Sequence, residues 1–182
     1  VNYITWGEWE FIDGPTSDVT IADVNDPTST VSINDQSVEC PYGAYYFKWT
    51  EYNGIGEGDA FEGCMDMDTV MIVISETPES ISAGEDLSFC EVFEFALDGT
   101  VDMPCTEETA YSITWELIDQ PGDCDVTIST PNSIDPMVTI DECDPCQYGE
   151  YIFKVTQKNG YYNRNQQFVE ICSESDLVSV WI

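Results

Sequence analysis

Residues 40–54 read CPYGAYYFKWTEYNG, and residues 146–160 read CQYGEYIFKVTQKNG. After the Tyr-Gly pair of each copy, apolar and polar side chains alternate, which is the period of a β-strand lying on a core. The inward positions are the same in both copies, namely Tyr45, Phe47 and Trp49 in the first and Tyr151, Phe153 and Val155 in the second. These two segments therefore predict one strand that occurs twice.

The likeness continues on both sides of this strand. Further blocks recur in the same order: WEFIDGP at Trp9 and WELIDQP at Trp115, DVTI at Asp18 and Asp125, and CMDMDTVMIVI at Cys64 and CSESDLVSVWI at Cys172. The period is about 107 residues, the size of one β-sandwich domain.

The period divides the chain into two repeats. We expect residues 1–74 to be the C-terminal two-thirds of one repeat and residues 75–182 to be one complete repeat. Residues 75–109, which contain SAGEDLSFC, have no counterpart upstream and form the opening third of the second repeat.

Short alternating segments separated by Asp-Gly, Asn-Gly and Pro-containing breaks predict an all-β chain, with no helical pattern of useful length. The Tyr-Gly-x-Tyr before each repeated strand resembles the tyrosine corner of immunoglobulin-like domains, and Trp115 fits the buried Trp of that fold. Trp6 and Trp9 both match this Trp in the first repeat. We therefore expect tandem immunoglobulin-like antiparallel β-sandwich repeats, the first one incomplete at its N-terminus.

The charge balance excludes one class of partner. The chain has 36 Asp and Glu against 4 Lys and Arg, no His, and a formal net charge of -32. Such a surface repels phosphate backbones, so we expect no nucleic-acid partner. No apolar stretch approaches the roughly 20 residues of a membrane span, so we expect no direct membrane insertion.

Eight singly spaced cysteines in a chain of this size favour disulfides and an oxidising compartment. The candidates are Cys40, Cys64, Cys90, Cys105, Cys124, Cys143, Cys146 and Cys172. Strand order suggests Cys105 with Cys172, and Cys90 and Cys124 with Cys143 and Cys146 in either order. Cys40 and Cys64 would then pair with the missing opening third of the first repeat.

Calcium is the one cofactor that the acidic clusters suggest, because calcium takes several oxygen ligands. Candidate ligands are Asp66, Asp68, Asp23 and Asp26, and a further cluster joins Asp141 and Glu142. The alternative is a solvated acidic surface, since so many acids cluster by chance.

We expect no enzymatic activity, because no His is present to activate a Ser or Cys nucleophile. Trp181, Tyr161 and Tyr162 are expected on an outward face or in a loop, where they are candidates for contact with a ligand or a neighbouring repeat. Thr69 lies in Asp-Thr-Val, which looks like a short O-glycosylation motif. The alternative is an ordinary strand residue.

Three motifs together carry a resemblance to a family: SAGEDLSFC at 82–90, YGEYIFKVTQKNG at 148–160 and CSESDLVSVWI at 172–182. They resemble the immunoglobulin-like and PKD-like repeats of large Bacteroidetes cell-surface proteins, and look most like SprB-type gliding-motility adhesins. The resemblance implies secretion by the type 9 pathway, display at the bacterial cell surface, and no catalytic residues. Cys105, Cys124 and Cys143 depart from the pattern of these repeats.

The sequence thus predicts a structural or adhesive segment of a long secreted filament protein used in gliding or attachment. Its expected partners are neighbouring repeats of the same chain and also surface polysaccharide or other filament subunits. Two alternatives remain: a β-sandwich module that binds a glycan or a protein, and a filament subunit that exchanges strands with another chain.

Overall fold

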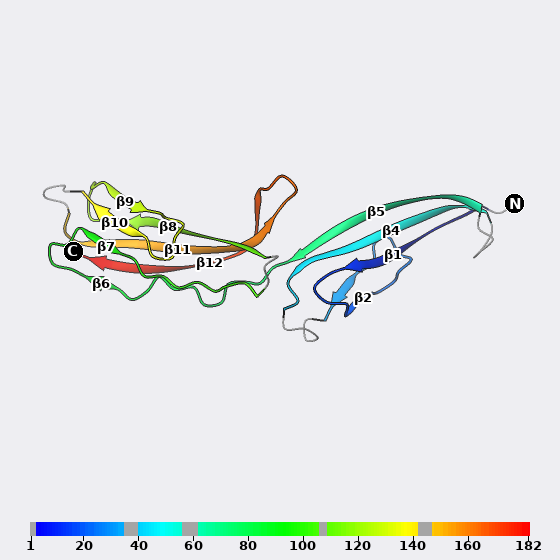
Figure 1. Cartoon of the computed structure of the whole chain (residues 1–182), viewed down its shortest axis with the longest axis horizontal. Coiled ribbons are helices and arrows are strands. Elements are labelled where there is room, and N and C mark those ends of the chain that lie inside the picture. Colours follow the sequence, from blue (N-terminus) through cyan, green and yellow to red (C-terminus); the bar gives the residue numbers. More distant parts are fainter. Residues whose placement is uncertain (1–2, 35–39, 56–61, 106–108, 142–146) are drawn as a thin grey trace. The chain divides into compact units, whose positions relative to one another are not determined.

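All regular elements in the described residues are β-strands, as Figure 1 shows. The computed structural model describes residues 3–34, 40–55, 62–105, 109–141 and 147–182. Its contacts divide the chain into two units, Val1–Ile74 and Ser75–Ile182. The boundary between Ile74 and Ser75 is also where the sequence period separates the two repeats.

The C-terminal unit contains a four-stranded and a three-stranded sheet. The first has the order β6-β12-β11-β8, with bounds Leu87–Ser88 (β6), Phe168–Trp181 (β12), Glu150–Tyr162 (β11) and Ala110–Asp119 (β8). The second has the order β7-β10-β9, with bounds Glu94–Ala96 (β7), Met137–Ile140 (β10) and Val126–Ser129 (β9). All pairs are antiparallel except β6 with β12, which is parallel.

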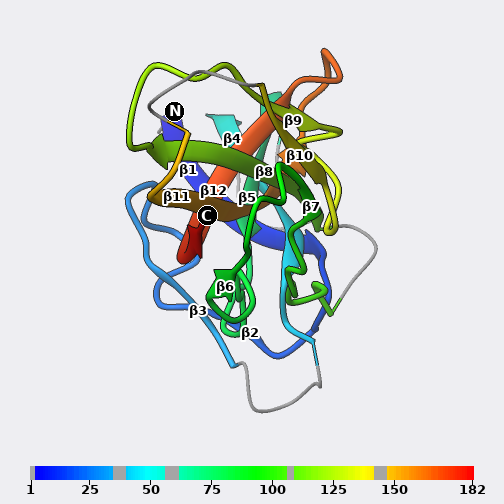
Figure 2. The ribbon, with the colours of Figure 1, turned by 90° about the vertical axis from the view of Figure 1, so that its left-hand side faces the viewer.

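One core joins these two sheets, so the unit is built as a β-sandwich. In Figure 2, which views this unit end-on, β7, β9 and β10 lie to one side of β8, β11 and β12. The alternation of strand β11 is confirmed, because Tyr151, Phe153 and Val155 are at most 1% exposed. The core also takes Trp115 and Ile113 from β8, Val178 and Val180 from β12, and Val138 and Ile140 from β10.

The N-terminal unit has a three-stranded antiparallel sheet and a strand pair. The sheet has the order β1-β4-β5, with bounds Tyr3–Asp13 (β1), Gly43–Ile55 (β4) and Glu62–Ile74 (β5). The pair joins β2 (Val19–Ile21) to β3 (Val31–Ile33). Tyr45 and Phe47 of β4 are buried, as the repeat predicts, whereas Trp49 is only partly buried.

Strand register shows which tryptophan of the first repeat matches Trp115. Trp115 lies opposite Val155 on the central strand β11, and Trp9 lies opposite Trp49, which takes the same place on β4. Trp6 lies opposite Tyr52 instead. Trp9 is therefore the counterpart of Trp115, and the sheet β1-β4-β5 is the counterpart of β8-β11-β12.

Candidate functional site

The tyrosine corner forms in both units. The Tyr45 hydroxyl donates a hydrogen bond to the Pro41 carbonyl over 2.5 Å, and the Tyr151 hydroxyl donates one to the Gln147 carbonyl over 3.0 Å. Each bond reaches back four residues and fixes the segment that enters the central strand. Burial raises the pKa of both phenols, so each stays protonated and remains a donor.

A lysine on each central strand meets a glutamate on the neighbouring strand. Lys48 Nζ lies 2.5 Å from Glu10 Oε2 in the N-terminal unit, and Lys154 Nζ lies 2.9 Å from Glu116 Oε2 in the C-terminal unit. Register makes these the same pair in the two repeats. The hydrogen bond to Glu10 raises the pKa of Lys48, and the bond from Lys154 lowers the pKa of Glu116.

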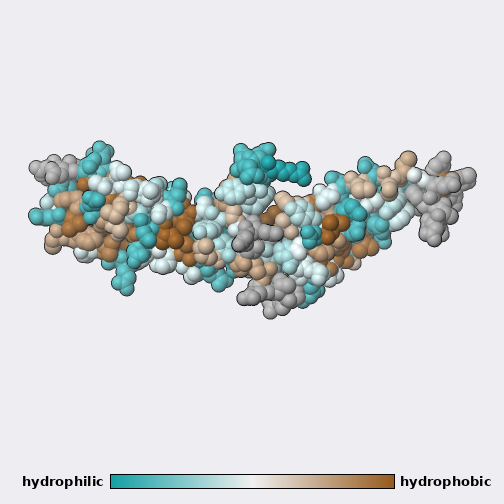
Figure 3. Space-filling view, in the orientation of Figure 1, coloured by the Kyte–Doolittle hydropathy of each residue, from teal (hydrophilic) through white to brown (hydrophobic). Residues whose placement is uncertain are grey.

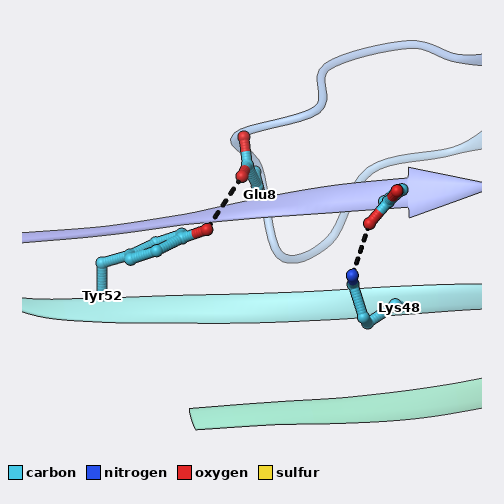
Figure 4. Close-up of polar contacts among 4 residues, drawn as sticks. Glu8, Lys48 and Tyr52 are labelled. Atoms are coloured by element: carbon cyan, nitrogen blue, oxygen red, sulfur yellow. Dashed lines mark hydrogen bonds and ion pairs between the residues drawn. The ribbon is translucent and has the colours of Figure 1, made fainter. Parts of the chain in front are cut away.

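Figure 4 shows a second polar contact beside the first of these pairs. The Tyr52 hydroxyl donates to Glu8 Oε1 over 3.1 Å, and its ring stacks on Trp6 with centroids 4.1 Å apart and planes inclined by 12°. Trp6 is 40% exposed. The sequence reasoning named Trp6 only as an alternative match for Trp115 and missed this pair.

The cysteines differ from the expected full set of disulfides. Cys40, Cys105 and Cys124 are disulfide-bonded. Cys64, Cys90 and Cys172 are free thiols, so the predicted pairing of Cys105 with Cys172 is wrong, and Cys90 does not pair as expected.

Two further cysteine predictions have different outcomes. Cys40 is bonded within the chain, so its partner is not in a missing opening third. Cys143 and Cys146 lie outside the described residues. Pairing in the described part of the chain is therefore partial, since a disulfide needs Cα atoms within about 7 Å and sequence order does not ensure this separation.

The predicted calcium ligands do not form one cluster. Asp66 and Asp68 lie within strand β5 rather than in a loop, and each accepts a hydrogen bond from the backbone N–H of the next residue. The described residues contain no group of three or more Cys, Asp or Glu side chains placed to hold a metal ion. Glu142, from the last acidic cluster, lies outside them.

Asp23 and Asp26 instead organise the turn between β2 and β3. Asp23 Oδ1 accepts from the Asn25 N–H over 2.9 Å, and Asp26 Oδ1 accepts from both the N–H and the hydroxyl of Thr28. These bonds from Thr28 lower the pKa of Asp26. The carboxylates therefore act as turn acceptors, a common use of Asp in loops.

The outward aromatic candidates are on strands. Trp181 of β12 is 51% exposed, and Tyr162 at the end of β11 is 58% exposed with its ring edge-on to Phe168. Tyr161 and Tyr162 both lie in β11, so their predicted loop position is wrong, and Tyr161 is also partly buried. Thr69 is an exposed residue of β5.

Apolar side chains on β5 are the feature that sequence reasoning missed most clearly. Met65, Met67, Val70, Met71 and Ile72 are each at least 40% exposed. Figure 3 shows hydrophobic atoms at the surface of the N-terminal unit.

No family model and no curated protein matches the chain. In the described residues no helix is long and apolar enough to cross a membrane.

Proposed function

We propose that the chain is a structural and adhesive repeat segment of a long secreted bacterial cell-surface filament, of the kind found in SprB-type gliding or attachment adhesins. The observation that carries the proposal is a β-frame built twice in series. Both units have a central strand between the same two neighbours, the same tyrosine corner and the same Lys-Glu pair. Duplicated units of this kind suit a protein whose role is to provide length and to hold other groups at a fixed spacing.

Chemistry supports the same role. Disulfide-bonded Cys40, Cys105 and Cys124 are compatible with an extracellular location, reached in this proposal by the type 9 pathway. The net charge of -32 keeps long arrays of such units apart and soluble. No His is present in the chain to activate a Ser or Cys nucleophile, so the proposal includes no catalytic role.

The experiment uses antibodies raised against this chain to capture the parent protein from non-reduced cell-surface material. Its intact mass and peptide map are then measured. We expect a polypeptide many times the 20.4 kDa of the chain, with further related repeats. A mature protein of about the size of this chain would overturn the proposal.

A second function, glycan or protein binding by one unit, is favoured by the exposure of Trp181 and of Trp6, which stacks on the partly buried Tyr52. Flat exposed aromatic rings provide the stacking surface that sugars use. Screening the intact chain on immobilised polysaccharides tests it. Binding that Trp181→Ala or Trp6→Ala abolishes would support this function, and absence of binding would leave the spacer role.

A further inference from the structure

Strands β5 and β12 occupy the same place in the two units but are covered differently. By register against β4 and β11, Ile72 takes the place of Val180 and Val70 takes the place of Val178. Val178 and Val180 are 1% and 0% exposed, whereas Val70 and Ile72 are 43% and 40% exposed. The same inward positions are therefore closed in one unit and open in the other.

In the C-terminal unit the described part of the opening segment, residues 75–105, closes these positions. Leu87 of β6 pairs in parallel with Val180, and the Phe89 N–H donates to the Trp181 carbonyl over 2.8 Å. Asp86 Oδ1 accepts from the Ser179 N–H over 2.9 Å. Main-chain and side-chain bonds together hold the segment along the edge of β12.

The same segment also enters the other sheet and the core. β7 pairs with β10, and its Phe95 packs edge-on against Phe153 with ring centroids 6.1 Å apart. Leu97 is 1% exposed, and its N–H donates to the Pro136 carbonyl over 3.0 Å. One extended segment thus supplies a strand to each sheet and aromatic and aliphatic side chains between them.

The N-terminal unit presents the matching groups. β5 is an edge strand of the order β1-β4-β5, and β3, which takes the place of β10, pairs only with β2 in the described residues. Asp68 takes the place of Asp176, whose Oδ2 accepts the Ala83 N–H over 3.0 Å. The backbone N–H of Met71 takes the place of that of Ser179.

We propose that this open face, formed by Val70, Ile72 and the free edge of β5, binds an extended polypeptide segment with the chemistry of residues 78–101. The segment adds a parallel strand beside Ile72 and Val73 and a short antiparallel strand beside β3, and places Leu and Phe side chains between them. An edge with a regular row of backbone donors and acceptors selects a peptide over a small apolar ligand. The proposal is independent of the filament role, because it concerns the face of one unit.

Electrostatics gives the interaction an unusual salt dependence. Residues 78–101 contain six acids and no base, and the chain they would bind has a net charge of -32. Like charges repel over about 10 Å at 0.1 M salt, and added salt shortens that range. Binding driven by apolar burial should therefore tighten as salt is raised, opposite to binding by charge attraction.

The test uses a fluorescent synthetic peptide of residues 78–101 carrying Cys90→Ser, titrated with the full chain in 0.05 M and 0.5 M NaCl. We expect saturable one-to-one binding by anisotropy, tighter at the higher salt. A peptide that also carries Phe95→Asp should bind at least about tenfold more weakly. Sedimentation of the chain alone is measured in parallel, and a dimer that excludes the peptide would overturn the choice of occupant in favour of a second copy.

Two adjacent residues of β5 provide the matched variants. Ile72 faces inward and Met71 faces outward, and they are 40% and 42% exposed, so a charge at either position meets similar solvent access. Ile72→Asp should weaken peptide binding at least about tenfold, and Met71→Asp should change it by less than about twofold. Circular dichroism checks that both variants fold, and no binding by the unmodified chain, or equal loss in both variants, would overturn the proposal.

Discussion

The two units stabilise the same three-stranded frame in different ways. Along β1 and β4 the N-terminal unit places aromatic rings opposite one another: Trp6 by Tyr52, Trp9 by Trp49 and Phe11 by Phe47. The C-terminal unit has Trp115 opposite Val155, and both are at most 2% exposed beneath the second sheet. Cross-strand aromatic pairs stabilise a sheet by contacts between its own strands. Burial of one face of a sheet needs a second sheet packed against that face. The difference shows that one frame can be retained while the layer above it changes.

The largest expected effect comes from placing a charge at equivalent positions of β12 and β5. Val180→Asp buries a carboxylate at a site that is 0% exposed and should destabilise the C-terminal unit by more than about 4 kcal/mol. Ile72→Asp, at 40% exposure, should cost less than about 1 kcal/mol. Hydrogen exchange followed by mass spectrometry reports the stability of each unit from its own peptides. Equal losses of stability in the two units would show that β5 and β12 are covered to the same extent.

Removal of a disulfide should have the next largest effect. Cys124 is bonded and 5% exposed, so Cys124→Ser should lower the free energy of unfolding of the C-terminal unit by about 2–4 kcal/mol. Urea unfolding with and without reductant measures this loss. Cys90→Ser is the matched control, since Cys90 is an exposed free thiol and its replacement should have little effect.

The tyrosine corners test whether the two units are stabilised in the same way by a feature that they share. Tyr45→Phe and Tyr151→Phe each remove one hydrogen bond to a backbone carbonyl and should each cost about 1 kcal/mol. Thermal unfolding followed by hydrogen exchange compares the two units. A much smaller loss for Tyr45→Phe would mean that the corner of the N-terminal unit contributes little without its cover.

The smallest effect is expected from the exposed Lys-Glu pairs. The hydrogen bond from Lys154 lowers the pKa of Glu116 below that of an unpaired Glu, so this pair stabilises the fold above the unfolded-state pKa. That contribution is lost as pH falls through the lowered folded-state pKa. Glu116→Gln should therefore reduce the melting temperature slightly at pH 7 and not at the acid end of the titration. Glu10→Gln is the parallel change in the other unit, and a large loss at neutral pH would contradict the view of these pairs as surface contacts.

Local patterns predicted the strands and the inward faces well. The period-two alternation that placed Tyr151, Phe153 and Val155 inside is a property of one strand and can be read within it. The tyrosine corner was equally accessible, because its bond spans only four residues. The all-β fold class follows from such local signals.

The features that the sequence reasoning missed depend on distant segments. The exposure of Ile72 is set by whether another segment lies over it, and its own alternation pattern is the same as that of Val180. Cys172 is a free thiol although strand order suggested Cys105 as its partner, because strand order does not fix the Cα separation that a disulfide needs. We predicted that Asp66 and Asp68 lie in a loop cluster, but strand pairing with β4 continues through both of them.

The positions of the four basic residues determine where trypsin-like proteases can cut the folded chain. Lys48, Lys154 and Lys158 all lie on central strands that are paired on both sides, while Arg164 lies exposed in the turn between β11 and β12. Proteases that cut after Lys or Arg need an extended, accessible backbone, and turns provide it more readily than central strands. A single nick at Arg164 would leave both flanking strands hydrogen-bonded in place. Trypsin-like proteases should therefore cut the folded chain first at Arg164 and leave the central strands intact.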